Sequence, residues 1–235
     1  MSSNPNLPPG QHEISTFPRF GLLQFAYRYP RDTKTIKISI TGGNDKSTVV
    51  ADALMQLPRV KQVSDFHCVT TWSRRGLTWS GFRFRDFYTE ILKPLFPGEN
   101  VGFILLKGQD GYRTSLPLED LLAEDVLLAD TLDGKPLTVE HGAPLRLVAP
   151  SHYGYKNIKH LDRIEIRSDG NLDISSGFRF MSHPRARVAH EERGTGVPGW
   201  MLRILYRPLV KPTIRRFQKA MTSYDESNTE KPLDE

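Results

Sequence analysis

The stretch DVLLADTLDGKPLTVEHGAPLRLVAPSHYGYKNIKH, residues 125–160, holds two short apolar runs and a block of basic side chains. The runs at 126–129 and 145–149 predict strands. In the second strand, side chains alternate, so that Arg146 shares one face with Val148, and Leu145 shares the other with Leu147. Arg146 is therefore expected in an apolar strand without an acidic neighbour in sequence.

Residues 141–160 contain no carboxylate, although six of their side chains are basic: His141, Arg146, His152, Lys156, Lys159 and His160. Burying an unpaired arginine is costly, so either its guanidinium reaches solvent or an anion from outside the chain completes it. Gly142 and Gly154 would allow the backbone to approach a ligand, and lysines suit phosphate. A solvated basic loop after an ordinary strand explains the same residues, and this alternative stays open.

Outside this stretch, short runs rich in β-branched residues predict further strands at 36–40, 63–69, 101–106 and 164–167. Apolar residues at helical spacing predict helices over 49–57, ending at Pro58, and over 84–92, ending at Pro94. Strands outnumber helices and do not alternate with them strictly. The pattern predicts an α+β fold with mixed β-sheets and peripheral helices.

Composition limits the class of protein. The chain has 235 residues, 38% of them hydrophobic and 25% charged, with a mean hydropathy of −0.44, which is typical of a globular protein and excludes a disordered or integral membrane chain. A single cysteine excludes an intramolecular disulfide, a CxxC zinc or redox pair and a CxxCH haem attachment. The first 15 residues lack the pattern of a secretory signal, so we expect a cytoplasmic location.

Charge is concentrated near the C-terminus. Seven of the basic residues fall between Arg193 and Tyr224 without one carboxylate among them: Arg193, Arg203, Arg207, Lys211, Arg215, Arg216 and Lys219. The near-neutral remainder argues against a nucleic-acid-binding protein. We expect a surface helix, interrupted at Pro208 and Pro212, with a solvated basic side. Docking to an anionic surface, an acidic redox partner or a lipid leaflet, is the alternative use.

Cys68 follows His67 at the end of the strand predicted over 63–69, before the polar run TTWSRR. A lone cysteine is most often a small buried hydrophobic residue. Here the polar run suggests that the chain leaves the core for a pocket, and Arg74 and Arg75 would favour a thiolate. A thiolate acts either as a nucleophile or as a soft metal ligand.

Four segments together resemble the molybdopterin-binding domain of the sulfite oxidase family, and most closely its small haem-free bacterial members. They are FHCVTTWS at 66–73, GYRTSLPLEDLL at 111–122, DVLLADTLDGKPLTVEHGAPLRLVAP at 125–150 and YGYKNIK at 153–159. The resemblance spans about residues 7–193. It implies the family's fold, with mixed sheets and peripheral helices, and one molybdopterin for each molybdenum.

The resemblance also implies residue roles. Cys68 matches the cysteine whose thiolate coordinates molybdenum. His141 and Arg146 match positions that contact the pterin and its phosphate, and Lys159, with the backbone around Asn157 and Ile158, matches the other phosphate contact. Arg74 is a candidate for orienting an oxyanionic substrate, with a plain surface charge as the alternative.

The resemblance predicts a molybdopterin-dependent oxidoreductase that moves an oxygen atom and two electrons between water and a small substrate, as a sulfite oxidase or a sulfoxide reductase does. Two alternatives remain. One is a cysteine-dependent hydrolase with Cys68 as nucleophile and His141 or His152 as base. The other is a non-enzymatic module that binds through its basic segment.

We further expect no haem and no flavin, because the sequence holds no motif for either, and therefore a separate electron-transfer partner. We expect a monomer that binds no nucleic acid. The expected organisation is an extended arm at 1–16, a catalytic domain at 17–195, a basic segment at 196–224 and a disordered acidic tail at 225–235.

Overall fold

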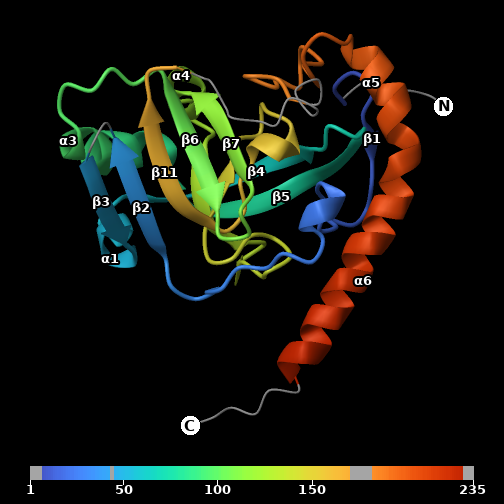
Figure 1. Ribbon diagram of the computed structural model, residues 1–235, viewed down its shortest axis with the longest axis horizontal. Coiled ribbons are helices and arrows are strands. Elements are labelled where there is room, and N and C mark those ends of the chain that lie inside the picture. Colours follow the sequence, from blue (N-terminus) through green and yellow to red (C-terminus); the bar gives the residue numbers. More distant parts are fainter. Residues whose placement is uncertain (1–6, 43–44, 170–181, 230–235) are drawn as a thin grey trace.

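Two β-sheets and a long C-terminal helix make up the computed structural model, which describes residues 7–42, 45–169 and 182–229 (Figure 1). Within these residues, one sheet has five strands in the order β3-β2-β11-β6-β7 and the other has six, built around β1-β5-β8-β10. Strands β2 and β11 run parallel, whereas β6 is antiparallel to β11. The sheets are therefore mixed, and the α+β prediction is confirmed.

The five-stranded sheet forms from residues on both sides of the stretch with which the sequence analysis began. Its strands are β2 (Lys37–Gly42), β3 (Asp45–Val50), β6 (Phe103–Gly108), β7 (Arg113–Pro117) and β11 (Leu161–Arg167). Their buried isoleucines and leucines join Leu145 and Leu147 in the main core. This core also includes the apolar side of the helical stretch 84–95, which consists of α2 (Phe84–Phe87), a π-helical turn (Tyr88–Leu92) and α3 (Lys93–Leu95).

The six-stranded sheet carries the segments around Cys68. Its strands are β1 (His12–Glu13), β4 (Arg59–His67), β5 (Trp72–Arg83), β8 (Leu127–Leu132), β9 (Lys135–Pro136) and β10 (Arg146–Val148). β4 pairs with one edge of β5, and both β1 and β8 pair with the other. Between the strands lie the short helices α1 (Ala51–Met55) and α4 (Leu118–Leu121) and the helical turns η1 (Leu23–Phe25) and η3 (Gly154–Lys156).

Two local predictions were wrong. Val49 and Val50 belong to strand β3 and not to a helix, because these β-branched residues pair with Ile38 and Lys37 in the β2–β3 hairpin. The polar run after Cys68 does not lead out of the core. It turns back at once into β5, a strand of twelve residues that pairs with β4 from Ser73 to Phe82.

The N-terminal segment lies along the sheet. His12 and Glu13 extend parallel to Trp72 and Ser73, and the amide of Gln11 donates to the carbonyl of Cys68 at 3.1 Å. Residues 7–13 thus cover the edge of β5 beside the cysteine.

The C-terminal segment is helical from α5 (Gly199–Tyr206) through the tight turn η5 (Arg207–Leu209) to α6 (Val210–Thr229), along one side of the molecule (Figure 1). The interruption expected at Pro208 is this turn, whereas Pro212 fits into the first turn of α6. α6 packs through the buried stripe of Val210, Thr213, Phe217 and Ala220. It also includes residues 225–229 of the expected tail, and residues 230–235 lie outside the described part. Among the described residues, no helix has both the length and the apolar character to cross a bilayer.

Candidate active site

Cys68 lies at the tight turn between β4 and β5. Its N–H donates to the carbonyl of Trp72 at 2.8 Å, and Thr71 closes the turn in the left-handed region at φ 92°. The side chain is 6% exposed and packs with Trp72 and with Val210 of α6. The turn therefore places the thiol under the C-terminal helix, at the edge of the six-stranded sheet.

Burial controls the state of this thiol. It raises the pKa of Cys68 to about 11, opposed by a contact of 3.1 Å between Sγ and the hydroxyl of Thr70 and by the charges of Arg193 and Lys159. We expected Arg74 and Arg75 to favour a thiolate, whereas the charges that oppose the effect of burial on this thiol are those of Arg193 and Lys159. Arg74 is half-buried and donates to the carbonyl of Arg75, so its role toward a substrate stays a prediction.

Arg146 shares a strand face with Val148 as the alternation predicts, and its side chain is buried, so the guanidinium does not reach solvent. Leu145 and Leu147 enter the main core, whereas Val148 joins a second cluster that includes Trp79. The Arg146 guanidinium lies over the Trp79 ring at 4.9 Å and donates to the carbonyl of His141 at 2.8 Å. It is 1% exposed and forms no ion pair with a carboxylate of the described residues. Burial accordingly lowers its pKa to about 9.

Lys159 brings a second cation to the same place. Its Nζ donates to the carbonyl of Glu140 at 2.7 Å, so that Lys159 and Arg146 bind the carbonyls of two consecutive residues. Burial and the charge of Arg146 lower the pKa of Lys159 to about 7. A Cβ at Gly142 would lie 3.1 Å from Cβ of Arg146 and 3.2 Å from Cβ of Lys159, and its φ is +110°. Glycine lets the loop pass between the two cations.

His141 completes this group, which we call the cation cluster (His141, Arg146 and Lys159). Its ring stacks on Phe17 at 4.9 Å, and its buried Nδ1 has no hydrogen-bond partner among the described residues. Burial, then the charges of Lys159 and Arg146, lower its pKa to about 3. Phe17 also contacts Phe66, two residues before Cys68, at 5.0 Å. The structure thus places the cation cluster and Cys68 around one aromatic layer.

Asn157 and Ile158 lie close to these residues. The Asn157 side chain accepts from the Ala149 N–H at 2.7 Å and donates to carbonyls of the same loop. Its own carbonyl lies 3.5 Å from the Arg146 guanidinium, and the Ile158 carbonyl accepts from the Leu147 N–H. Both residues hold the loop that carries the cluster, and their contact with a phosphate stays a prediction.

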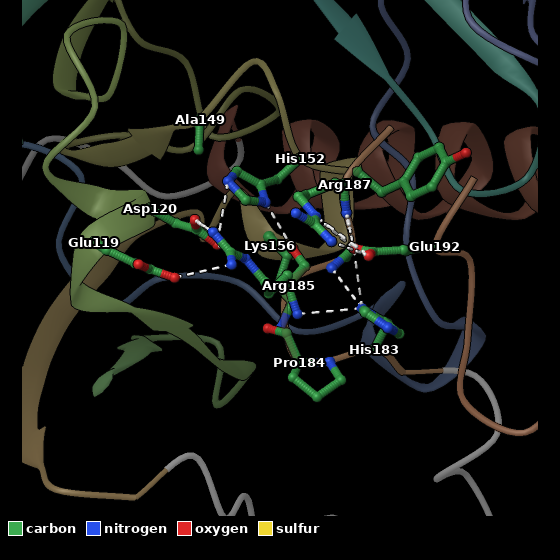
Figure 2. Close-up of polar contacts among 12 residues, drawn as sticks. Glu119, Asp120, Ala149, His152, Lys156, His183, Pro184, Arg185, Arg187 and Glu192 are labelled. Carbon is green, nitrogen blue, oxygen red and sulfur yellow. Dashed lines mark hydrogen bonds and ion pairs between the residues drawn. The ribbon is translucent and has the colours of Figure 1, made fainter. Parts of the chain in front are cut away.

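A partly exposed ionic network around the buried Asp120, which the sequence analysis did not find, anchors the returning segment 182–193. Figure 2 shows Arg185 between Glu119 and Asp120, and Arg187 and His183 against Glu192. Lys156 donates to the carbonyls of Ser115 and Pro184 at 2.7 and 2.8 Å. Its ammonium thus binds backbone carbonyls of the protein itself. His152, another residue of the basic stretch 141–160, donates from Nδ1 to the Arg185 carbonyl at 2.6 Å.

Arg193, at the end of this segment, reaches the cysteine turn. It is fully buried, donates to the carbonyls of Val69 and Pro9, and pairs with Glu191 at 3.2 Å. The sequence analysis counted Arg193 with the seven basic residues near the C-terminus, although it precedes the segment 196–224, and the structure places it in the interior of the domain. In the sequence, the one signal that distinguishes Arg193 from the basic residues of the helices is its distance of ten positions from the next of them, Arg203.

Comparisons with known proteins identify the family to which the chain belongs. Residues 26–173 match the family described as "Oxidoreductase molybdopterin binding domain". The chain is 35% identical over 166 residues to the uncharacterized oxidoreductase YuiH of Bacillus subtilis, covering 70% of this chain and 81% of that protein. It is 31% identical over 179 residues to the protein-methionine-sulfoxide reductase catalytic subunit MsrP of Campylobacter jejuni, covering 68% of this chain and 60% of that protein.

Among solved structures, the fold is similar to the sulfane dehydrogenase SoxCD of Paracoccus pantotrophus, with a TM-score of 0.51 at 20% identity, covering 65% of this chain and 44% of that chain. The mixed sheets, the matched segment and the YuiH alignment point to one family. The chain therefore belongs to the oxidoreductases with a molybdopterin-binding domain, the sulfite oxidase family.

Proposed function

We propose that this molybdopterin-dependent oxidoreductase holds its cofactor between Cys68 and the cation cluster, and transfers an oxygen atom to or from a small substrate. The observation that carries the proposal is that the buried guanidinium of Arg146 lies next to the half-buried Lys159 and pairs with no carboxylate of the described residues. Two adjacent cations, one buried and one half-buried, repel each other, and a phosphate between them would remove this penalty.

The donor set fits the rest of the cofactor. Within the described residues, no group of three or more His, Cys, Asp and Glu side chains is arranged to hold a metal ion. A soft thiolate at Cys68 suits a metal that is already held by sulfur. When bound, molybdenum–molybdopterin supplies two-electron oxygen-atom exchange. The chain supplies a phosphate site, an unpartnered His141 Nδ1 beside it, and a desolvated cysteine.

The hydrolase alternative does not fit. A cysteine nucleophile needs a base within hydrogen-bond reach. The group at 3.1 Å from the Cys68 thiol is the Thr70 hydroxyl, whereas the His152 Nδ1 is bound to the Arg185 carbonyl. The family assignment supports the oxidoreductase over this alternative.

We extend the proposal to the remaining partners. A small molecule is the substrate, with Arg74 as the candidate for orienting an oxyanion, and a separate protein or soluble carrier exchanges the electrons. Absence of haem and flavin, a monomeric state and a cytoplasmic location stay predictions.

The test is the metal and pterin content of protein made in a host that synthesises the cofactor. We expect Cys68→Ser to lower the molybdenum content about tenfold or more while the pterin and the melting temperature are largely retained, since serine keeps the volume but is a poor ligand for this metal. Thr70→Val is the matched control, because it disturbs the same turn and keeps the thiol. Full molybdenum in the Cys68→Ser protein would refute the proposed ligand.

A further inference from the structure

Helix α5 and turn η5 expose an apolar surface that the active site does not use. We call it the α5 patch, and it consists of Trp200, Met201, Ile204, Leu205 and Leu209, which are between 41% and 62% exposed. The opposite side of α5 is also apolar, because Leu202 and Tyr206 are buried against the domain. A surface helix normally exposes polar residues on its outer side, so α5 has one apolar side more than the fold requires.

This exposure is concentrated and not scattered over the surface. The described residues include eleven large hydrophobic side chains with high exposure, and five of them fall within residues 200–209. Single exposed hydrophobic residues are ordinary, whereas a contiguous group marks an interaction surface.

Basic side chains continue the α5 patch along α6. Lys211, Arg215, Arg216 and Lys219 are exposed, and the sequence has no carboxylate from 194 to 223. Arg203 of α5 lies 3.4 Å from Glu191, which compensates part of its charge. The described residues form no ion pair with these four side chains, and an apolar group next to such a basic row is complementary to a surface that is apolar below and negatively charged above.

We propose that α5 and the start of α6 bind the interface of an anionic lipid bilayer. Tryptophan and aliphatic side chains next to arginines and lysines are typical of helices that lie in such an interface. Each basic residue near an anionic leaflet adds to binding. α6 also packs over Cys68 through Val210 and Ile214, so the docking element and the site share a helix.

A bilayer fits this surface better than a second copy of the chain does. Two copies packed through their α5 patches would bring two basic rows together, and the like charges would repel. The apolar side chains project from a single short helix, and a fluid lipid interface accepts them without a matching shape.

The experiment is co-sedimentation of the full chain with vesicles of phosphatidylcholine, with and without phosphatidylglycerol. We expect binding to the anionic vesicles and much weaker binding to the neutral ones, with a loss as salt rises. Ile204→Ser/Leu205→Ser and Lys211→Glu/Arg215→Glu should each weaken binding about tenfold or more. The matched controls are Met55→Ser/Val63→Ser and Lys37→Glu/Lys135→Glu, which change exposed residues of the same kinds elsewhere.

The controls should bind as the unchanged chain does, and circular dichroism should match for all variants. The proposal is overturned if the unchanged chain ignores anionic vesicles, or if the α5 or α6 variants bind them like the controls. Dimerisation through α5, or tight binding of an acidic protein with no binding of vesicles, would overturn it in favour of that partner. The assay needs no cofactor, so its outcome is independent of the proposed function.

Discussion

Replacing Arg146 with methionine removes a buried charge while keeping most of the side-chain volume. If Arg146 serves a phosphate, the substitution should cost the protein its cofactor and cost the apoprotein little stability. If Arg146 is structural, the losses should be reversed. The contacts of this residue allow both effects to be estimated.

For the apoprotein, the two contributions nearly cancel. Burial lowers the pKa of Arg146 from its usual range to about 9, which corresponds to a penalty of at most about 5 kcal/mol for the charged form. Against its removal stand a charge-assisted hydrogen bond to the His141 carbonyl at 2.8 Å, worth about 2 kcal/mol, and the contact with the Trp79 ring at 4.9 Å, worth about 1–2 kcal/mol. We expect the free energy of unfolding to change by less than about 2 kcal/mol.

For the binding free energy of the cofactor, no second contribution offsets the loss of the arginine. Losing a charge-assisted contact to a buried phosphate costs about 2–5 kcal/mol, or about 30-fold to several thousand-fold in affinity. Urea unfolding of the apoprotein gives the first quantity, and molybdenum and pterin content after purification gives the second. Arg163→Met, at an exposed arginine of β11, is the control. Undiminished cofactor together with a loss of more than about 4 kcal/mol in stability would show that Arg146 only supports the fold.

Two further predictions concern the charges around this site. The pKa of Lys159 is about 7 in the folded protein and about 10.4 in the unfolded chain. Between these two pH values the unfolded chain therefore binds one proton more than the folded protein does. The free energy of unfolding of the apoprotein should rise with pH in this window, by up to about 1.4 kcal/mol per pH unit from this residue, and fall as the pH drops toward 7. Urea unfolding at pH 7.5, 8.5 and 9.5 should show a shallower rise for Lys159→Met, and equal slopes would contradict the assigned shift. Arg193→Met should destabilise the protein by about 3 kcal/mol, because the carbonyls of Val69 and Pro9 lose their donor and Glu191 keeps only Arg203 as a partner. In urea unfolding, adding Glu191→Gln to this variant should restore part of the lost stability. An Arg193→Met protein as stable as the unchanged chain would show that these contacts of Arg193 do not stabilise the fold.

The cation cluster was predictable because it lies in one continuous stretch. Strand alternation placed Arg146 opposite Leu145 and Leu147, and the absence of carboxylates from 141 to 160 indicated that its charge had no partner nearby in sequence. Both features are local, so they do not depend on how distant segments pack. Lys156 shows the limit of this reasoning, because its carbonyl partners, Ser115 and Pro184, are 41 and 28 residues away.

The surroundings of Cys68 were less predictable for the same reason. Strand β5 contains serines, arginines and threonine, and forms because β4 and β8 flank it. Its polar composition hides that pairing. Gln11 and Arg193 come to the cysteine turn from residues 57 and 125 positions away in sequence, and only the returning chain brings them there.

Burial disfavours the negative charge of a Cys68 thiolate and the positive charges of Arg146 and Lys159. A single ligand of suitable charge pattern could stabilise both. Burial keeps the cysteine protonated and therefore uncharged, so it does not neutralise Arg146 or Lys159. A free phosphate would satisfy the cations and leave the thiol as it is. A bare metal ion would draw a thiolate and be repelled by the same cations. We propose that a ligand with a phosphate at one end and a sulfur-held metal at the other would remove both penalties, and we expect a domain with this charge pattern to bind such a ligand in preference to phosphate or a metal ion alone.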